Sequence, residues 1–355
     1  MATQFWVTVG SPHKDFLKSS LERQEYMQAP DRIISITPLI LPDTYPTKEA
    51  MRSCNQNETS YDPQLWELEY HTRRSLARTS DEYVQERYKS IVRNMRALTS
   101  PDRHVIPINT FLSSWYWYRK EHQTRYELNL RGVPPSVSPP ERPIENTNAK
   151  VPLRPSHPNS CDIIFRYTNR EYAEKMLEQG EIRIGAASEV EKRTSDKARY
   201  DKELSKDSFS PGEHVRIVTP DGKKAPIIGD LCTTTFMPDY YFFCMSCDWD
   251  ADLFQDFGVD SCVVIKDRKE FSVRVEKATQ KELPGFEFFD LPVEYYDPYE
   301  RIKNQKIDAG LSESFDFAYQ REFRLLWHSP HAAASGYKFL HLGSLADIAE
   351  IHSIE

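Results

Sequence analysis

Two side chains with chemical potential, Gln320 and Glu322, stand two residues apart in the stretch Phe315–Trp327. Apolar and polar residues alternate along this stretch, which predicts a late, buried strand with Gln320 and Glu322 on one face. A carboxylate on a buried strand must be paired with a cation or used in chemistry. The simpler interpretation is an ion pair with Arg324 or a neighbouring arginine, and the chemical interpretation is a catalytic carboxylate.

An arginine and a serine precede this pair on two other predicted strands. Arg166 lies in the predicted strand Cys161–Tyr167, and a predicted helix over Asn169–Gln179 follows it. Ser246 ends the aromatic predicted strand Tyr240–Cys247. An arginine offers a forked pair of donors that suits phosphate oxygens. Taken singly, Arg166 fits a surface ion pair, and Ser246 fits a hydroxyl that caps the following helix.

The order of the three signals, an arginine, then a serine, then Gln-x-Glu, resembles the arginine–serine–glutamate branch of the ADP-ribosyltransferase superfamily. The resemblance implies an NAD-dependent mono-ADP-ribosyltransferase, a glycosyl-transferring enzyme with NAD as co-substrate. It implies that Arg166 binds the NAD phosphates, with Tyr167 beside it, and that Ser246 supports the nicotinamide-ribose site. It further implies that Glu322 is catalytic and that Gln320 addresses the acceptor.

The resemblance covers about residues 160–330 and leaves the serine motif with two candidate positions. Cys244-Met245-Ser246 stands where the family often has Ser-Thr-Ser, and Thr233-Thr234-Thr235 competes for the same role. The loop at roughly Ile307–Phe317 corresponds by resemblance to the family's substrate-recognition loop. The arrangement also resembles bacterial toxins and phage-defence effectors of this fold.

The residue types suit the chemistry that the resemblance implies. Breaking the nicotinamide–ribose bond builds positive charge on the ribose, and a fixed carboxylate such as Glu322 stabilises that charge. The amide of Gln320 can both donate to and accept from a base edge or an Asn or Gln side chain. Phe315 and Phe317 lie just upstream and could stack on a base. We therefore expect a macromolecular acceptor, with RNA or DNA slightly favoured over protein.

Three functions remain open on the sequence. The first is an NAD-dependent ADP-ribosyltransferase that acts as an intracellular toxin, for example in a toxin–antitoxin pair, or as an antiviral defence effector. The second is a catalytically degenerate module of the same fold that binds a nucleotide. The third is an NAD glycohydrolase, in which water is the acceptor.

The chain of 355 residues is expected to be α+β, with a split β-sheet domain of the ADP-ribosyltransferase type over residues 161–355. Residues 1–131 predict a mainly helical targeting or regulatory domain, on which an antitoxin or regulator would bind. Helix-start signals stand there at Asp62-Pro63 and Thr79-Ser80-Asp81-Glu82. Residues 132–160 hold eight of the 24 prolines, which predicts an extended linker.

Charge and composition restrict the cellular location and the binding partners that we expect for this protein. Residues 1–150 carry 20 basic and 18 acidic residues, whereas the remaining 205 carry 26 and 36, a net charge of −10 that does not favour nucleic acid by bulk attraction. No apolar run reaches membrane-spanning length, so we expect a cytoplasmic protein with no membrane partner. The six cysteines show no disulfide-framework spacing, and buried thiols fit Cys244 and Cys247 better than a zinc site, so we expect no metal.

The segment Trp115–Lys120 places aromatic residues beside basic ones. Single-strand nucleic-acid platforms share this composition. The favoured interpretation is a helix whose aromatic side chains pack on its neighbours, with Arg119 and Lys120 in water.

Overall fold

The computed structural model describes residues 5–9, 61–99, 105, 107–108, 115–139, 161–192, 202–211, 217–218, 222–225, 230–300, 305–332 and 334–353. The chain divides into two units, each built from separate stretches of sequence. Unit 1 comprises Met1–Pro158, Asp207–Thr234 and Tyr296–Gln305, and unit 2 comprises Asn159–Lys206, Thr235–Tyr295 and Lys306–Glu355. The expected domain 161–355 differs from unit 2, because two of its stretches belong to unit 1. Beyond residue 139, the predicted linker lies outside the described residues.

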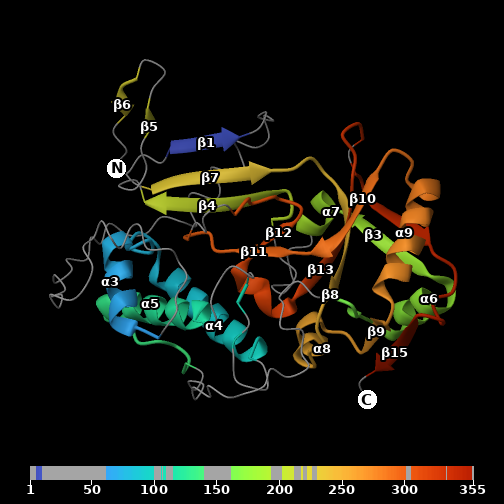
Figure 1. Cartoon of the computed structure of the whole chain (residues 1–355), viewed down its shortest axis with the longest axis horizontal. Helices are drawn as coiled ribbons and strands as arrows, with labels where there is room; N and C mark the ends of the chain where they lie inside the picture. The colour runs from blue at the N-terminus through green and yellow to red at the C-terminus, as the bar shows by residue number, and fades with distance from the viewer. Residues whose placement is uncertain are drawn as a thin grey trace. The chain divides into compact units, whose positions relative to one another are not determined.

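The described residues of unit 1 include three helices, which Figure 1 shows as α3 (Pro63–Arg73), α4 (Asp81–Ala97) and α5 (Tyr116–Leu130). Both predicted start signals are confirmed, because the Asp62 side chain caps α3 and the Ser80 side chain caps α4. Apolar residues of these helices, Tyr70, Val84, Tyr88, Val92 and Leu128, pack together with Leu76, which lies between α3 and α4, and with Tyr299, which comes from a late stretch of the chain.

The expectation that Arg119 and Lys120 face water is wrong. Both are 3% exposed and belong to a buried ionic cluster in unit 1. Arg87 donates to the two carboxylate oxygens of Asp297 at 3.0 and 2.6 Å, and Lys120 contacts the same carboxylate. Arg119 contacts Glu300 at 2.6 Å. Burial lowers the pKa of Lys120 to about 7. For Asp297, burial acts to raise the pKa, but the positive charges of Arg87 and Lys120 outweigh it and hold this pKa well below its ordinary value.

Unit 2 is mixed α+β and is built on an eight-stranded sheet. Its main path runs β10-β13-β8-β2-β9-β15, and β3 pairs with both β8 and β14. The strands are β2 (Ile164–Thr168), β3 (Glu181–Ala186), β8 (Tyr241–Ser246), β9 (Ser261–Ile265), β10 (Glu287–Pro292), β13 (Glu322–His328), β14 (Tyr337–His341) and β15 (Ala349–Ser353).

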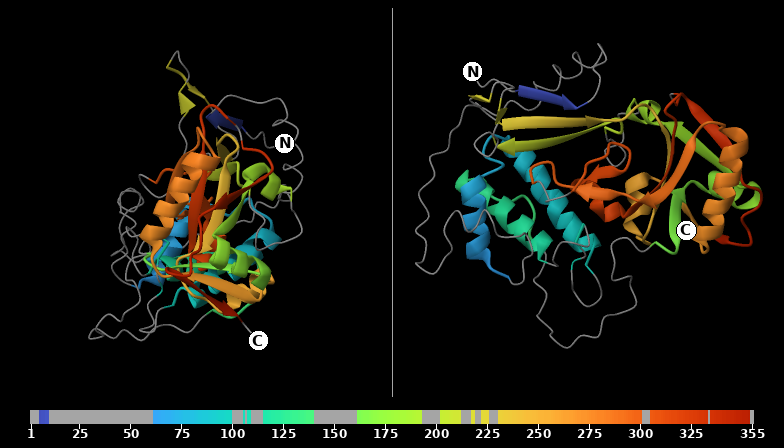
Figure 2. Two further views of the ribbon diagram at one scale, coloured as in Figure 1. Left: turned by 90° about the vertical axis from the view of Figure 1, so that its right-hand side faces the viewer. Right: turned by 45° about the horizontal axis from the view of Figure 1, so that its top comes forward.

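Two helices cover one face of this sheet, α6 (Arg170–Gln179) and α9 (Arg268–Glu282). Figure 2 shows α9 along β10 and β14, and the core that these helices share with the sheet includes Met176, Val275, Phe243, Leu325 and Trp327. Gly180 ends α6 at φ 65°, as expected of a C-cap. It is also tightly enclosed, because a Cβ there would lie 2.1 Å from the carbonyl oxygen of Gly343.

The remaining described elements are short. They are β1 (Phe5–Val9), β4 (Ser205–Pro211), β5 (Ile217–Val218), β6 (Lys224–Ala225), β7 (Asp230–Phe236), β11 (Glu294–Tyr296), β12 (Ser312–Ser314), α7 (Ala187–Glu191) and α8 (Asp252–Phe257). Strands β4 and β7 both cross the division between the units. Among the described residues, no helix combines the length and the apolar character needed to cross a membrane.

The central strand β8 has a divided edge. On one side it pairs with β13 along its whole length. On the other side its first residues, Tyr241 and Phe242, pair with β3, and its last residue, Ser246, pairs with β2. Strands β2 and β3 therefore separate between these points, and the sheet splits beside the residues between Phe242 and Ser246.

The prediction of one strand over Phe315–Trp327 is wrong in its first half. Residues Phe315–Gln320 form a 3-10 helix, η2, and β13 begins only at Glu322. Between them Arg321 has φ 46°, a left-handed conformation that turns the chain. Gln320 therefore does not project beside Glu322 from a common strand. The second half follows the prediction, because Phe323, Leu325 and Trp327 all enter the core.

Cys161 and Cys247 form a disulfide. The expectation that Cys247 is a buried thiol is therefore wrong. The bond joins the chain just before β2 to the residue after β8, 86 positions later. It leaves Cys244 as a thiol and removes Cys247 from the possible zinc ligands. Disulfides are rare in cytosolic proteins, so this bond does not support the expected location.

Candidate functional site

A cavity of about 540 Å³ in unit 2 lies where the sheet splits. Phe243, Cys244 and Met245, the residues of β8 beside the split, all line it. The predicted site residues are brought together here, because the lining includes Arg166, Tyr167, Ser246, Phe317, Gln320 and Glu322. Thr233-Thr234-Thr235 lies in β7 and is not among the described residues that line the cavity, so Ser246 is the serine at this site.

Arg166 is held at the edge of the split. Its Nη1 donates to the carbonyl oxygen of Cys244 at 2.5 Å, and its guanidinium carbon lies 4.3 Å from the centre of the Phe243 ring. The carbonyl of Cys244 belongs to the part of β8 where β2 and β3 have separated. The aromatic contact and the hydrogen bond orient the cation toward the cavity wall.

Ser246 connects three segments at the end of β8. It lies opposite Glu322 across the β8–β13 ladder. Its hydroxyl is within donating distance of the carbonyl oxygens of Gln320 at 2.7 Å and Asp248 at 2.9 Å, and it accepts from the Asp248 amide at 3.2 Å. It does not cap α8, which starts at Asp252. Ser246 therefore fixes η2 against the start of β13.

Ser246→Ala is expected to lower the free energy of unfolding by about 1–3 kcal/mol, because it leaves the partly buried backbone carbonyl of Gln320 without its donor. Denaturant titration at constant pH measures the change. Ser344→Ala, at an exposed serine, is the control and should stay within about 0.5 kcal/mol of the parent. An unchanged midpoint for Ser246→Ala would show that the hydroxyl does not hold η2.

Glu322 is buried at the cavity wall and is also paired. Its Oε1 accepts from Arg324 Nε at 2.8 Å, and its backbone amide donates to the Tyr295 hydroxyl at 2.8 Å. The simpler interpretation of Glu322 as a partner of Arg324 thus describes a contact that exists. Burial, followed by the negative charge of Glu322, raises the pKa of the neighbouring Cys244 thiol well above its ordinary value. That thiol therefore stays protonated and is a poor nucleophile.

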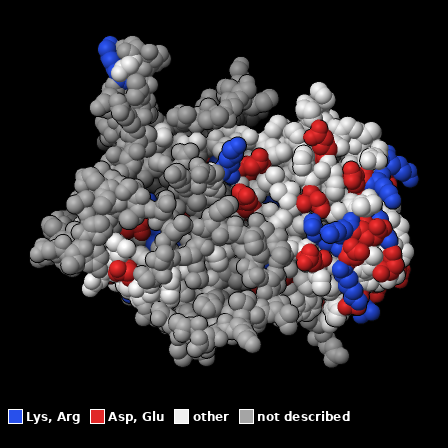
Figure 3. Space-filling view, viewed as in Figure 1, with Lys and Arg blue, Asp and Glu red and all other residues white. Residues whose placement is uncertain are grey.

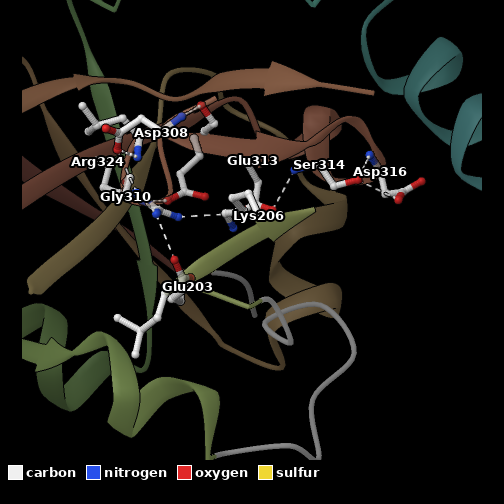
Figure 4. A network of polar contacts seen from close by, with 12 residues as sticks. Glu203, Lys206, Asp308, Gly310, Glu313, Ser314, Asp316 and Arg324 are labelled. Carbon is white, nitrogen blue, oxygen red and sulfur yellow. Dashed lines mark hydrogen bonds and ion pairs between the residues drawn. The ribbon is translucent and has the colours of Figure 1, made fainter. Parts of the chain in front are cut away.

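Arg324 is the centre of a buried polar network, which Figure 4 shows from close by. Its Nη1 donates to Glu203 Oε2 and to the carbonyl oxygen of Gly310, both at 2.9 Å, and its Nε donates to Glu322. Glu313 lies 3.6 Å from its Nη2 and 3.1 Å from Lys206 Nζ. Arg324 is 1% exposed, so three carboxylates meet two cations away from water.

Burial sets the protonation of this network. It raises the pKa of Glu203 to about 7, with Arg324 opposing the rise and the carboxylates of Glu313 and Glu322 adding to it. Burial also lowers the pKa of Lys206, which Glu313 partly offsets. Glu203 is thus placed to gain or lose its proton near neutral pH.

The sequence reasoning missed Glu203, Lys206 and Glu313. The first two lie in a highly charged stretch between residues 187 and 212, and Glu313 lies in the loop that the resemblance assigns to substrate recognition. Nothing local distinguishes these residues from surface charges. The role of Glu203 depends on its contact with Arg324, which lies more than 100 residues further along the sequence.

The aromatic residues of the site have different positions. Phe317 lines the cavity, but Phe315 is fully buried in unit 2 and cannot stack on a substrate base. Tyr167 lines the cavity and accepts from the Asp250 amide at 2.7 Å, with the Phe254 ring 5.1 Å away. Burial raises the pKa of Tyr167, so its hydroxyl remains protonated.

No protein-family model matches this chain, and no curated protein or solved structure matches it significantly.

Proposed function

We propose that unit 2 is an NAD-dependent mono-ADP-ribosyltransferase. The observation that carries the proposal is the common cavity: Arg166, Ser246 and Glu322 come from three different strands and line one space at the split of the sheet. On this proposal Arg166 binds the phosphates, Tyr167 forms part of the wall, and Ser246 supports the nicotinamide-ribose end.

The residues around the cavity fit NAD in kind and in size. The volume of about 540 Å³ lies within the range of small-molecule sites. Arg166 and Arg183 provide cations for a pyrophosphate, and the rings of Phe165 and Phe243 provide apolar surface for a planar group. Glu322 provides an acceptor for a ribose hydroxyl.

The proposed chemistry places the negative charge of Glu322 where the ribose becomes positive. The surroundings of Glu322 are largely closed to water, so this carboxylate acts more strongly than it would in solution. Arg324 holds the carboxylate in one orientation through its Nε. NAD supplies the ADP-ribosyl group when it is bound.

The proposed acceptor is a macromolecule addressed by Gln320, which lines the cavity and donates to the Tyr319 hydroxyl at 3.1 Å. With Phe315 buried, stacking on a nucleobase rests on Phe317 alone. Figure 3 shows acidic and basic side chains interspersed over the described part of the face that is drawn, which offers no broad basic surface there. RNA or DNA is slightly favoured over protein because the Phe317 ring at the cavity can stack on a base. The proposed setting is a toxin or defence effector, with unit 1 as the part that an antitoxin or regulator binds.

A second candidate is a nucleotide-binding module without chemistry. The ion pair between Glu322 and Arg324 favours it, because a carboxylate already held by a cation has part of its charge neutralised. NAD hydrolysis with water as the acceptor uses the same residues as transfer.

Incubation with NAD labelled on its adenylate part separates these functions. Label that moves onto macromolecules of a host lysate supports transfer, and its removal by nuclease or by protease identifies the class of acceptor. Free labelled ADP-ribose with no labelled acceptor indicates a glycohydrolase. Binding of NAD without turnover indicates the module, and the absence of binding contradicts all three.

Gln320→Glu is expected to lower the ratio of transfer to hydrolysis by roughly 10-fold, because a carboxylate cannot donate to the acceptor as the amide does. The two products of one labelling reaction give this ratio directly. Gln280→Glu, at an exposed position of α9, is the matched control and should leave the ratio unchanged. An unchanged ratio in Gln320→Glu would remove Gln320 from acceptor recognition.

A further inference from the structure

Besides Glu322, the cavity is lined by two carboxyl groups that have no place in the Gln-x-Glu motif, Glu203 and Glu313. Glu203 comes from the stretch just before β4, is 5% exposed and lines the cavity together with Glu322. Its Oε2 accepts from Arg324 Nη1 at 2.9 Å and from the Tyr240 hydroxyl at 3.2 Å. A carboxyl that is both buried and open to a substrate-sized space is placed to exchange a proton with a bound group.

Arg324 fixes Glu203 relative to Glu322. One nitrogen of the guanidinium bonds Glu203 and another bonds Glu322. Because the guanidinium is planar and rigid, it sets the separation of the two carboxyls. Arg324 is itself immobilised by the Gly310 carbonyl and by the Phe242 ring 5.0 Å away.

The two carboxyls have different surroundings. Glu203 faces Arg324 and Glu322 of β13, Glu313 of β12 and the Cys244 thiol of β8. It also faces the hydroxyl of Tyr240, the residue just before β8. Burial and the two neighbouring carboxylates raise the pKa of Glu203 to about 7 against the pull of Arg324. A pair of carboxyls in unlike environments is the arrangement by which enzymes divide proton transfer from charge stabilisation.

Glu313 is less suited to exchange a proton. One of its oxygens contacts Lys206 Nζ at 3.1 Å, and the other accepts from the Ser314 amide at 2.8 Å. Both oxygens of Glu313 therefore already accept from donors of this chain.

We infer that Glu203 is the general base that takes the proton from the acceptor while Glu322 stabilises the ribose. This inference rests on the proposed function. In the step, the acceptor's oxygen or nitrogen forms the new bond to the ribose carbon, its proton passes to an oxygen of Glu203, and the electrons of the broken bond leave with neutral nicotinamide. Glu203 returns its proton to solvent before the next turnover.

The first test is the pH profile of turnover in purified full-length protein. The parent rate should rise with pH through about 7, because only ionised Glu203 accepts a proton. Glu203→Gln should lower the rate by about 10²–10⁴-fold and remove that rise, whereas Glu203→Asp, which keeps a carboxyl, should recover part of it. Glu350→Gln, the same change at a half-exposed carboxylate on β15, is the control and should match the parent.

The second test reads protonation without activity. A carboxyl whose pKa is raised from 4.5 to about 7 by folding contributes stability that is fully present below the unfolded value and is lost as the pH rises through 7. The melting temperature of the parent should therefore fall between pH 5 and pH 8 relative to that of Glu203→Gln, which lacks this titration. NAD should bind to both proteins with similar affinity.

The outcomes separate the inference from the proposed function. A parent that turns over NAD while Glu203→Gln keeps both the rate and the pH profile overturns the inference and leaves the transferase. A Glu203→Gln protein that is folded but has lost NAD binding also overturns it, because the role would then lie in binding. A parent that neither transfers nor hydrolyses overturns both. Loss of the rate and of the pH-dependent step, with binding retained, supports the inference.

Discussion

Glu322→Gln is expected to lower turnover of NAD by at least about 100-fold while the protein still binds NAD. Glutamine keeps the shape of the side chain, and its Oε1 can still accept from Arg324 Nε. What it removes is the negative charge that faces the ribose in the transition state. The loss should therefore fall on kcat, and the dissociation constant from calorimetry should change little.

The matched control for this substitution is Glu276→Gln at an exposed position of α9. It makes the same chemical change in unit 2 outside the cavity and should behave as the parent. If expression of the parent arrests growth of the host, Glu322→Gln should relieve the arrest and Glu276→Gln should not. A Glu322→Gln protein with turnover close to that of the parent would exclude the proposed mechanism.

Arg324→Met should lower the free energy of unfolding by about 3–5 kcal/mol at neutral pH. Methionine keeps much of the length and apolar surface of the side chain, but Glu203, Glu313 and Glu322 lose the cation that they share. A buried carboxylate left without its partner is much more costly than an exposed one. The deficit should shrink as the pH falls, because protonation removes the negative charges.

Chemical denaturation of the variant and the parent over a range of pH measures this effect. Arg170→Met on α6 is the control, because it breaks an exposed pair with Glu174 and should cost no more than about 0.5 kcal/mol. Adding Glu203→Gln to Arg324→Met should recover part of the loss, since one buried charge is then absent. A loss below about 1 kcal/mol for Arg324→Met would show that solvent reaches the network.

Local signals in the sequence were sufficient for the helices and for the apolar half of β13. Ser80 and Gly180 act through their own side chain or backbone conformation, so their positions could be predicted without knowledge of the fold. The alternation of Phe323, Leu325 and Trp327 directly reflects one buried face of a strand.

The first half of the predicted strand failed because local polar contacts prevailed over the alternation. The Ser314 hydroxyl accepts from the Asp316 amide and starts η2, and Arg321 then takes a left-handed conformation. Serine and aspartate commonly redirect the backbone in this way. The period-two pattern of apolar residues gave no sign of this turn.

Of the residues at the candidate site, the sequence predicted only those that belong to the motif. Arg166, Ser246, Gln320 and Glu322 stand at positions that a strand pattern and a resemblance could select, and all four line one cavity. The ion pair of Glu322 with Arg324 was one of the two interpretations of the sequence, but the contact of Arg324 with Glu203 could not be predicted, because these two residues are 121 positions apart. The Cys161–Cys247 disulfide was missed for the same reason.

The ionic cluster of unit 1 has a consequence for the order of events during synthesis. Arg87 and Asp297 are 210 positions apart, so the helices that carry Arg87 and Lys120 leave the ribosome long before the carboxylate that contacts both. Until residue 297 has emerged, these cations must remain hydrated, and the helices cannot close around them. Unit 1 can therefore complete its folding only late in translation, after most of unit 2 has been synthesised.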